Sequence, residues 1–158
     1  MKQHLIKILL LALFILPTVS RAQQQSDQNQ VSIRAFYSSY ALIYQSPNFD
    51  DFYKKYSALL DKYASSSFKQ SILSGLDDPN IPPLDIATDD NGIQAQYLGN
   101  LKVEKRGAYY LVRYPIYDSD EKKYIEIGLK ITLDSHGKIQ SVSGSYTKEI
   151  KAPTDLNK

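Results

Sequence analysis

Residues 124–133, YIEIGLKITL, place an aliphatic side chain at every second position, and this pattern constrains the fold more than any other feature of the chain. A period of two residues is typical of a β-strand that is buried on one face. The aliphatic face consists of Ile125, Ile127, Leu129, Ile131 and Leu133, and the opposite face includes Glu126, Lys130 and Thr132. We therefore expect a sheet that packs on one side only.

Three further segments, residues 101–105, 108–117 and 138–146, predict strands around this one. In residues 108–117 one predicted face carries Tyr110, Val112, Tyr114 and Ile116. The turn sequences RG, DSDEKK and DSHG separate the segments, and Gly137 suits the positive φ of a hairpin turn. This spacing predicts an antiparallel meander.

Helical patterns precede these strands. Residues 31–44 place apolar side chains three and four positions apart, at Ile33, Phe36, Tyr37, Tyr40 and Tyr44. Similar stripes predict a helix over about residues 48–64 and a shorter one over 66–76, followed by a loop rich in Pro and Asp. Helices followed by a run of antiparallel strands predict an α+β fold.

Pro115 and Gly128 lie inside two predicted strands, where such residues usually bend or bulge a sheet. A bent sheet wrapped around an amphipathic helix would form a cone. This is the shape of the nuclear transport factor 2-like and cystatin-like folds.

The segments AFYSSY (35–40), KKYSALL (54–60), LGNLKVEKRGAYYLVRY, YIEIGLKIT and GKIQSVSG resemble an exported bacterial family, the domain of unknown function numbered 3828. The resemblance spans about residues 31–144 and rests on the order of elements and on short apolar patterns. It implies a fold like that of nuclear transport factor 2. It implies no catalytic residue, since the family has no settled activity.

The N-terminus predicts export. An apolar run from Ile8 to Pro17 follows basic residues and is too short to span a membrane, and Ser20 and Ala22 fit a small-x-small cleavage site. We expect a signal peptide over residues 1–22, a leader over 23–30, one domain over 31–150 and a tail over 151–158. The mature protein would be periplasmic or extracellular and would not insert into the membrane.

Composition argues against a nucleic-acid partner and against disulfides and lipid attachment. Three of the 19 basic residues lie in the expected signal peptide, which leaves 16 against 17 acidic residues, so a nucleic-acid partner is not expected. The chain has no cysteine, so neither a disulfide nor a lipid attachment site is available.

The acidic segment LDIATDDNG, with Asp85, Asp89 and Asp90, is the one weak candidate for a metal site. An EF-hand aligned on its glycine would put Ala87 at the first ligand position and Leu98 at the bidentate glutamate, so that motif is excluded. A solvated acidic loop is the simpler interpretation, and we expect no metal.

The sequence favours no enzymatic chemistry and no cofactor. His136 is the one histidine after the expected cleavage site, and it lies in a predicted turn. No nucleophile motif or phosphate loop occurs. Carboxylate and tyrosine chemistry inside a cone stays open, because such groups meet only in space.

The 13 tyrosines supply two candidate binding sites. The first would line the cone and bind a small apolar or sugar-like ligand, and its residues are Tyr37, Tyr40, Tyr44, Tyr110 and Tyr114. Aromatic residues at this spacing are more often simply core.

The second site would be the open sheet face, with Tyr109, Arg113, Tyr117, Tyr124, Glu126 and Lys130. Because Tyr and Arg are enriched at interfaces, this face could contact a protein.

The sequence thus predicts a non-enzymatic exported binding domain that uses either the open face or the cone. An alternative is an immunity-type inhibitor that neutralises a periplasmic toxin or a cell-wall hydrolase.

Overall fold

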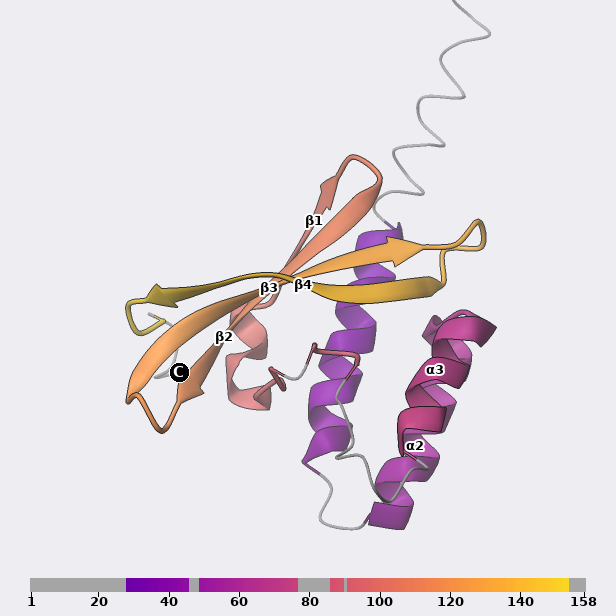
Figure 1. The fold of residues 1–158 in the computed structure, drawn as a ribbon, viewed down its shortest axis with the longest axis horizontal. Helices are drawn as coiled ribbons and strands as arrows, with labels where there is room; N and C mark the ends of the chain where they lie inside the picture. The colour runs from indigo at the N-terminus through magenta and orange to yellow at the C-terminus, as the bar shows by residue number, and fades with distance from the viewer. Residues whose placement is uncertain (1–27, 46–48, 77–85, 90, 154–158) are drawn as a thin grey trace, which may run out of the picture.

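The computed structural model describes residues 28–45, 49–76, 86–89 and 91–153. Helices are followed by a four-stranded antiparallel sheet, which confirms the α+β class (Figure 1). The expected signal peptide and residues 154–158 lie outside the described residues.

The described residues include three α-helices. The first covers residues 28–44, α2 covers Phe49–Tyr63 and α3 covers Ser66–Leu76. An ion pair of 2.6 Å joins Lys55 to Asp51 in the first turn of α2, where the helix dipole favours the carboxylate. The first helix includes residues 28–30, which we had assigned to the leader. It extends this far because Asn29 contacts the sheet, donating a 3.2 Å hydrogen bond to the Tyr110 hydroxyl.

The sheet is a meander with the strand order β1-β2-β3-β4. It contains β1 (Lys102–Arg106), β2 (Tyr109–Asp118), β3 (Lys123–Leu133) and β4 (Ile139–Ile150). A short 3-10 helix, η1 (Ala95–Asn100), precedes β1 and was not predicted. β4 also continues beyond residue 146, where we expected it to end, because it stays paired with β3 as far as Tyr124 and Ile150.

The β3–β4 hairpin has the predicted turn. Gly137 has a φ of 75°. The Asp134 carboxylate accepts backbone hydrogen bonds from His136 and Lys138, and these bonds, that from Lys138 foremost, lower the pKa of Asp134. His136 is exposed at this turn, as expected.

Gly128 and Pro115 interrupt the regular pairing of the sheet, as the sequence predicts. The pairing of β3 with β4 shifts register at Gly128/Leu129, which is a bulge. The pairing of β2 with β1 reaches only as far as Arg113, and Pro115 lies two residues beyond it. The backbone of Tyr117, two residues further on, points to the free edge of β2, so the missing N–H of Pro115 falls on that edge as well.

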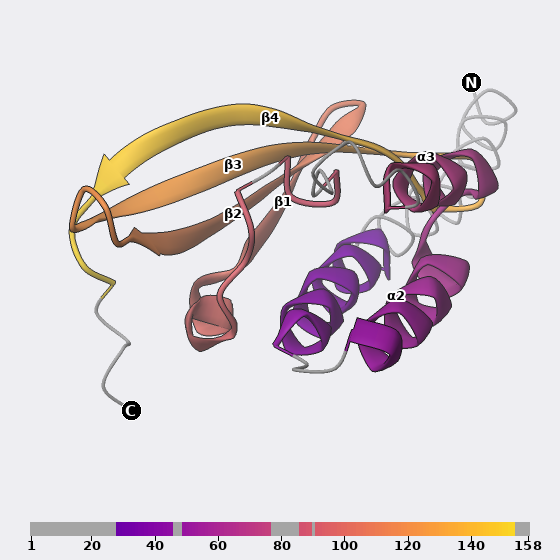
Figure 2. The same cartoon turned by 60° about the horizontal axis from the view of Figure 1, so that its bottom comes forward.

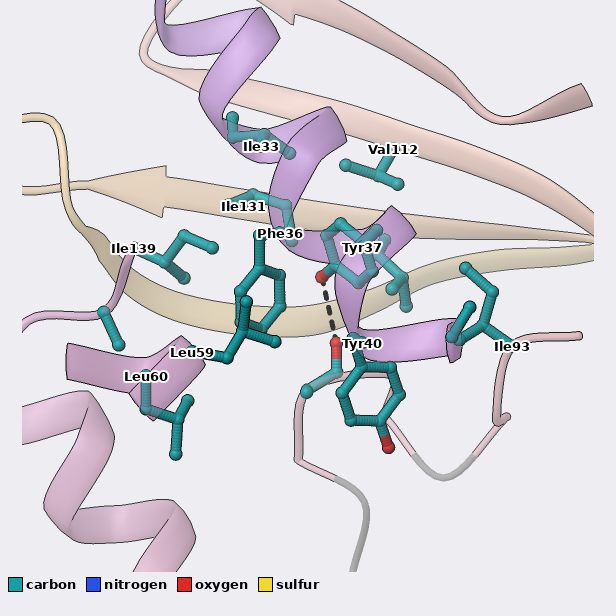
Figure 3. Packing of buried hydrophobic residues seen from close by; sticks show 14 of the residues in the cluster. Ile33, Phe36, Tyr37, Tyr40, Leu59, Leu60, Ile93, Val112, Ile131 and Ile139 are labelled. Carbon is teal, nitrogen blue, oxygen red and sulfur yellow. Dashed lines mark hydrogen bonds between the residues drawn. The ribbon is translucent and has the colours of Figure 1, made fainter. Parts of the chain in front are cut away.

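The helices and the sheet enclose one core. The first helix supplies Ile33, Phe36 and Tyr37, which pack on β2 and β3 residues such as Val112 and Ile131 (Figure 3). Ile127, Leu129 and Ile131 are at most 1% exposed, so the predicted facing of β3 is confirmed. In Figure 2 the first helix and α2 lie below the arched sheet, and no described α-helix lies over its upper face.

Candidate binding face

The strand register gathers the predicted open-face residues on one side of the sheet. Tyr117 is paired with Tyr124, Pro115 with Glu126, Arg113 with Gly128 and Leu111 with Lys130. Paired residues share a face, and every second residue along a strand returns to it. The face therefore contains all six predicted residues: Tyr109, Arg113, Tyr117, Tyr124, Glu126 and Lys130. It is the face opposite the first helix and α2 (Figure 2). We call it the open face.

Arg113 occupies the centre of the open face and holds two carboxylates. Its Nη2 atom pairs with Glu104 of β1, and its Nη1 atom lies 4.0 Å from Glu126 Oε1. Glu126 also accepts a 2.8 Å hydrogen bond from the Tyr146 hydroxyl of β4. Burial, together with this bond to Glu126, raises the pKa of Tyr146 above its ordinary value of 10.0. The network thus links all four strands across the face.

The Tyr146 ring lies directly over Gly128. A Cβ added to Gly128 would stand only 2.5 Å from Tyr146 Cε1. Glycine therefore creates the space that the ring fills, and the hydrogen bond to Glu126 fixes the ring there. The sequence analysis identified Gly128 as a bend but did not identify Tyr146 as its partner.

An aromatic cluster lies near the β2–β3 hairpin. The Tyr117 and Tyr124 rings are 5.0 Å apart and tilted by 56°, and Tyr97 of η1 meets Tyr124 edge-on at 6.0 Å. Burial, with a smaller contribution from the Tyr97 hydroxyl, raises the pKa of Tyr124. The Tyr124 side chain is only partly exposed, whereas Tyr117 is 38% exposed.

Gln94 completes this end of the face. Its side-chain amide both donates to the Tyr117 carbonyl and accepts from the Tyr117 N–H, each at 3.3 Å. The Gln94 amide therefore takes the place of a neighbouring strand beyond Lys102, the first residue of β1. Neither Gln94 nor Tyr97 was a predicted site residue, since nothing in the local sequence distinguishes them.

Lys130 lies near the other end of the face. Its ammonium group is 5.1 Å from the centre of the Tyr109 ring, within the range of a cation–π contact. The ammonium remains exposed to solvent.

Most of the predicted cone tyrosines are core residues. Tyr37, Tyr40, Tyr110 and Tyr114 are at most 5% exposed and belong to the core cluster. The Tyr37 hydroxyl donates a 2.9 Å hydrogen bond to the Ala87 carbonyl, drawn as the dashed line in Figure 3. A ligand could reach these rings only by displacing core packing. The Tyr44 ring lies 5.9 Å from that of Tyr40 at the margin of this cluster, and Tyr44 is 56% exposed.

The acidic segment offers one described carboxylate. Asp85 and Asp90 lie outside the described residues, while Asp89 has a φ of 52° and an exposed side chain next to Gly144 of β4. Within the described part of the chain, no group of three or more His, Cys, Asp or Glu side chains is arranged to hold a metal ion.

Comparisons with known proteins leave the chain without an assigned family. No family model matches it, and neither the curated proteins nor the solved structures contain a significant match. None of the described helices is both long enough and apolar enough to cross a membrane.

Proposed function

We propose that this protein is a non-enzymatic, exported binding domain that contacts a partner protein through the open face. The observation that carries the proposal is the contrast between the two sides of the sheet. One side is buried under helices, and the other carries tyrosines and Arg113 in addition to the Lys and Glu that are usual on a solvated face. Tyr and Arg are the residue types that most often dominate binding energy at interfaces.

The burial of the cone tyrosines favours the open face over a cone ligand. Four of the five candidate rings have almost no exposed surface, so the small-ligand interpretation requires an opening of the core. No described observation favours a toxin or a hydrolase as the partner in particular.

The finer fold proposal is a nuclear transport factor 2-like or cystatin-like arrangement, as the resemblance to the exported bacterial family implies. It is supported by helices on one side of a bent meander and by the bulge at Gly128.

Site-specific photo-crosslinking in the native cell tests the proposed face. Tyr117 is replaced by benzoyl-phenylalanine, and the matched control carries the same group at Leu42, which is an exposed apolar residue of the first helix. We expect a defined protein adduct from position 117 and none from position 42. An adduct from position 42 alone would place the interface on the helices and refute the proposal.

A further inference from the structure

The open face has a charge opposite to that of the expected mature chain. The register places five basic side chains on it, Lys102, Arg106, Arg113, Lys130 and Lys148, against two carboxylates, Glu104 and Glu126. The expected mature chain has 16 basic and 17 acidic residues. The excess of positive charge is therefore a property of this face and not of the protein as a whole.

Both carboxylates of the face are already engaged. Glu104 pairs with Arg113 and with Arg106, at 2.6 Å for the latter, and Glu126 interacts with Arg113 and Tyr146. Within the described part of the chain, no carboxylate lies at ion-pair distance from Lys102, Lys130 or Lys148. These three exposed ammonium groups surround a centre that is neutralised internally.

We propose that the open face binds an acidic surface of a partner protein, with Lys102, Lys130 and Lys148 pairing with its Asp and Glu side chains. This inference rests on the proposed function and names the chemistry of the partner. Complementary charge steers encounter and suppresses wrong partners, and the neutral centre together with the tyrosines at both ends of the face supplies the contact area.

The shape of the face favours a protein over an anionic glycan. Sugar rings stack on flat aromatic platforms, but the Tyr117 and Tyr124 rings are tilted by 56° and Tyr97 stands nearly perpendicular to Tyr124, at 78°. The backbone of the sheet also arches away from the first helix and α2 (Figure 2). A four-stranded face of this length offers on the order of 600 Å², which suits a transient and salt-sensitive contact.

Retention on immobilised polyglutamate tests the chemistry. The protein is purified from cells that express the full chain, as wild type and as the triple variant Lys102→Gln, Lys130→Gln, Lys148→Gln. The control triple, Lys54→Gln, Lys105→Gln, Lys151→Gln, removes the same charge from exposed lysines outside the open face. We expect the affinity at low salt to fall about tenfold or more in the open-face triple and less than about twofold in the control.

Two outcomes would overturn the inference. Equal losses in the two triples would show that only total charge matters. Tighter retention of the wild type on polygalacturonate than on polyglutamate would assign the face to an acidic polysaccharide instead.

The crosslinking experiment separates this inference from the proposed function. If the adduct at position 117 disappears in the open-face triple but persists in the control, the acidic-partner inference is supported. If it persists in both, the face binds a partner by other chemistry, so the inference fails and the proposed function stands. If the wild type gives no adduct at position 117, the proposed function itself fails.

Discussion

At the scale of single residues, Gly128 and Tyr146 depend on each other. The bulge at Gly128/Leu129 brings the β4 ring over the β3 backbone, and only a residue without a Cβ leaves room for it. A close contact between an aromatic ring and a strand glycine also restores packing that glycine alone cannot provide. The Tyr146 ring thus covers the backbone that Gly128 would otherwise leave exposed on the open face.

Gly128→Ala should destabilise the protein by about 1–3 kcal/mol, because the added methyl group collides with a ring that is held by Glu126. The measurement is the free energy of unfolding in urea. Gly99→Ala is the control, since a Cβ there meets nothing within 4 Å. Equal stability of Gly128→Ala and wild type would mean that the ring does not occupy this position in solution.

At the scale of elements, the sheet is defined by its two unlike faces. β3 contributes Ile127, Leu129 and Ile131 to the core and Glu126 and Lys130 to the open face. A shift of one residue in register would exchange these faces, so the alternation itself stabilises the observed pairing.

Ile127→Ser should cost about 3 kcal/mol or more, because it leaves a cavity and buries a hydroxyl in the core. Lys130→Ser, on the other face of the same strand, should cost less than about 1 kcal/mol. Thermal and urea unfolding of the two variants compare the faces directly. A larger loss in Lys130→Ser would reverse the assignment of the faces.

The elements were largely predictable from the sequence, whereas the contacts that shape the open face were not. Periods of two and of three to four residues determine which side of a strand or helix is buried. This is why the facing of β3 and the stripe of the first helix, apart from the exposed Tyr44, were predicted correctly. Gln94 and Tyr97 act through partners more than twenty residues away, Tyr117 on β2 and Tyr124 on β3, which no local pattern indicates. Burial also decided the role of the cone tyrosines, since a helical aromatic stripe is compatible with both a pocket and a core.

At the scale of the whole molecule, the helices shield one side of the sheet and leave the other side available. The described fold has no disulfide to stabilise it, so the single core must hold the sheet in the shape that presents the open face. Export of such a domain would bring the open face to partners outside the cytoplasm.

We expect the cell to remove residues 1–22 and to release a protein that begins at Gln23. Intact-mass measurement on protein isolated from the cell envelope checks this expectation, and Ala22→Leu should slow the processing because it replaces the small residue at the cleavage site. A full-length N-terminus in the envelope fraction would contradict export by cleavage.

β4 is an edge strand, and proteins with an open sheet can aggregate through such edges. It is a 12-residue edge strand, and the described residues pair with its outer side only at the single bridge between Ala64 and Ile139. Long unpaired edges recruit identical strands and seed fibrils. Here the two register shifts and the exposed Lys148 interrupt the ladder that a second copy would have to extend. The irregular edge therefore opposes strand-to-strand association between copies, which leaves the open face, rather than the edge, as the surface for recognition.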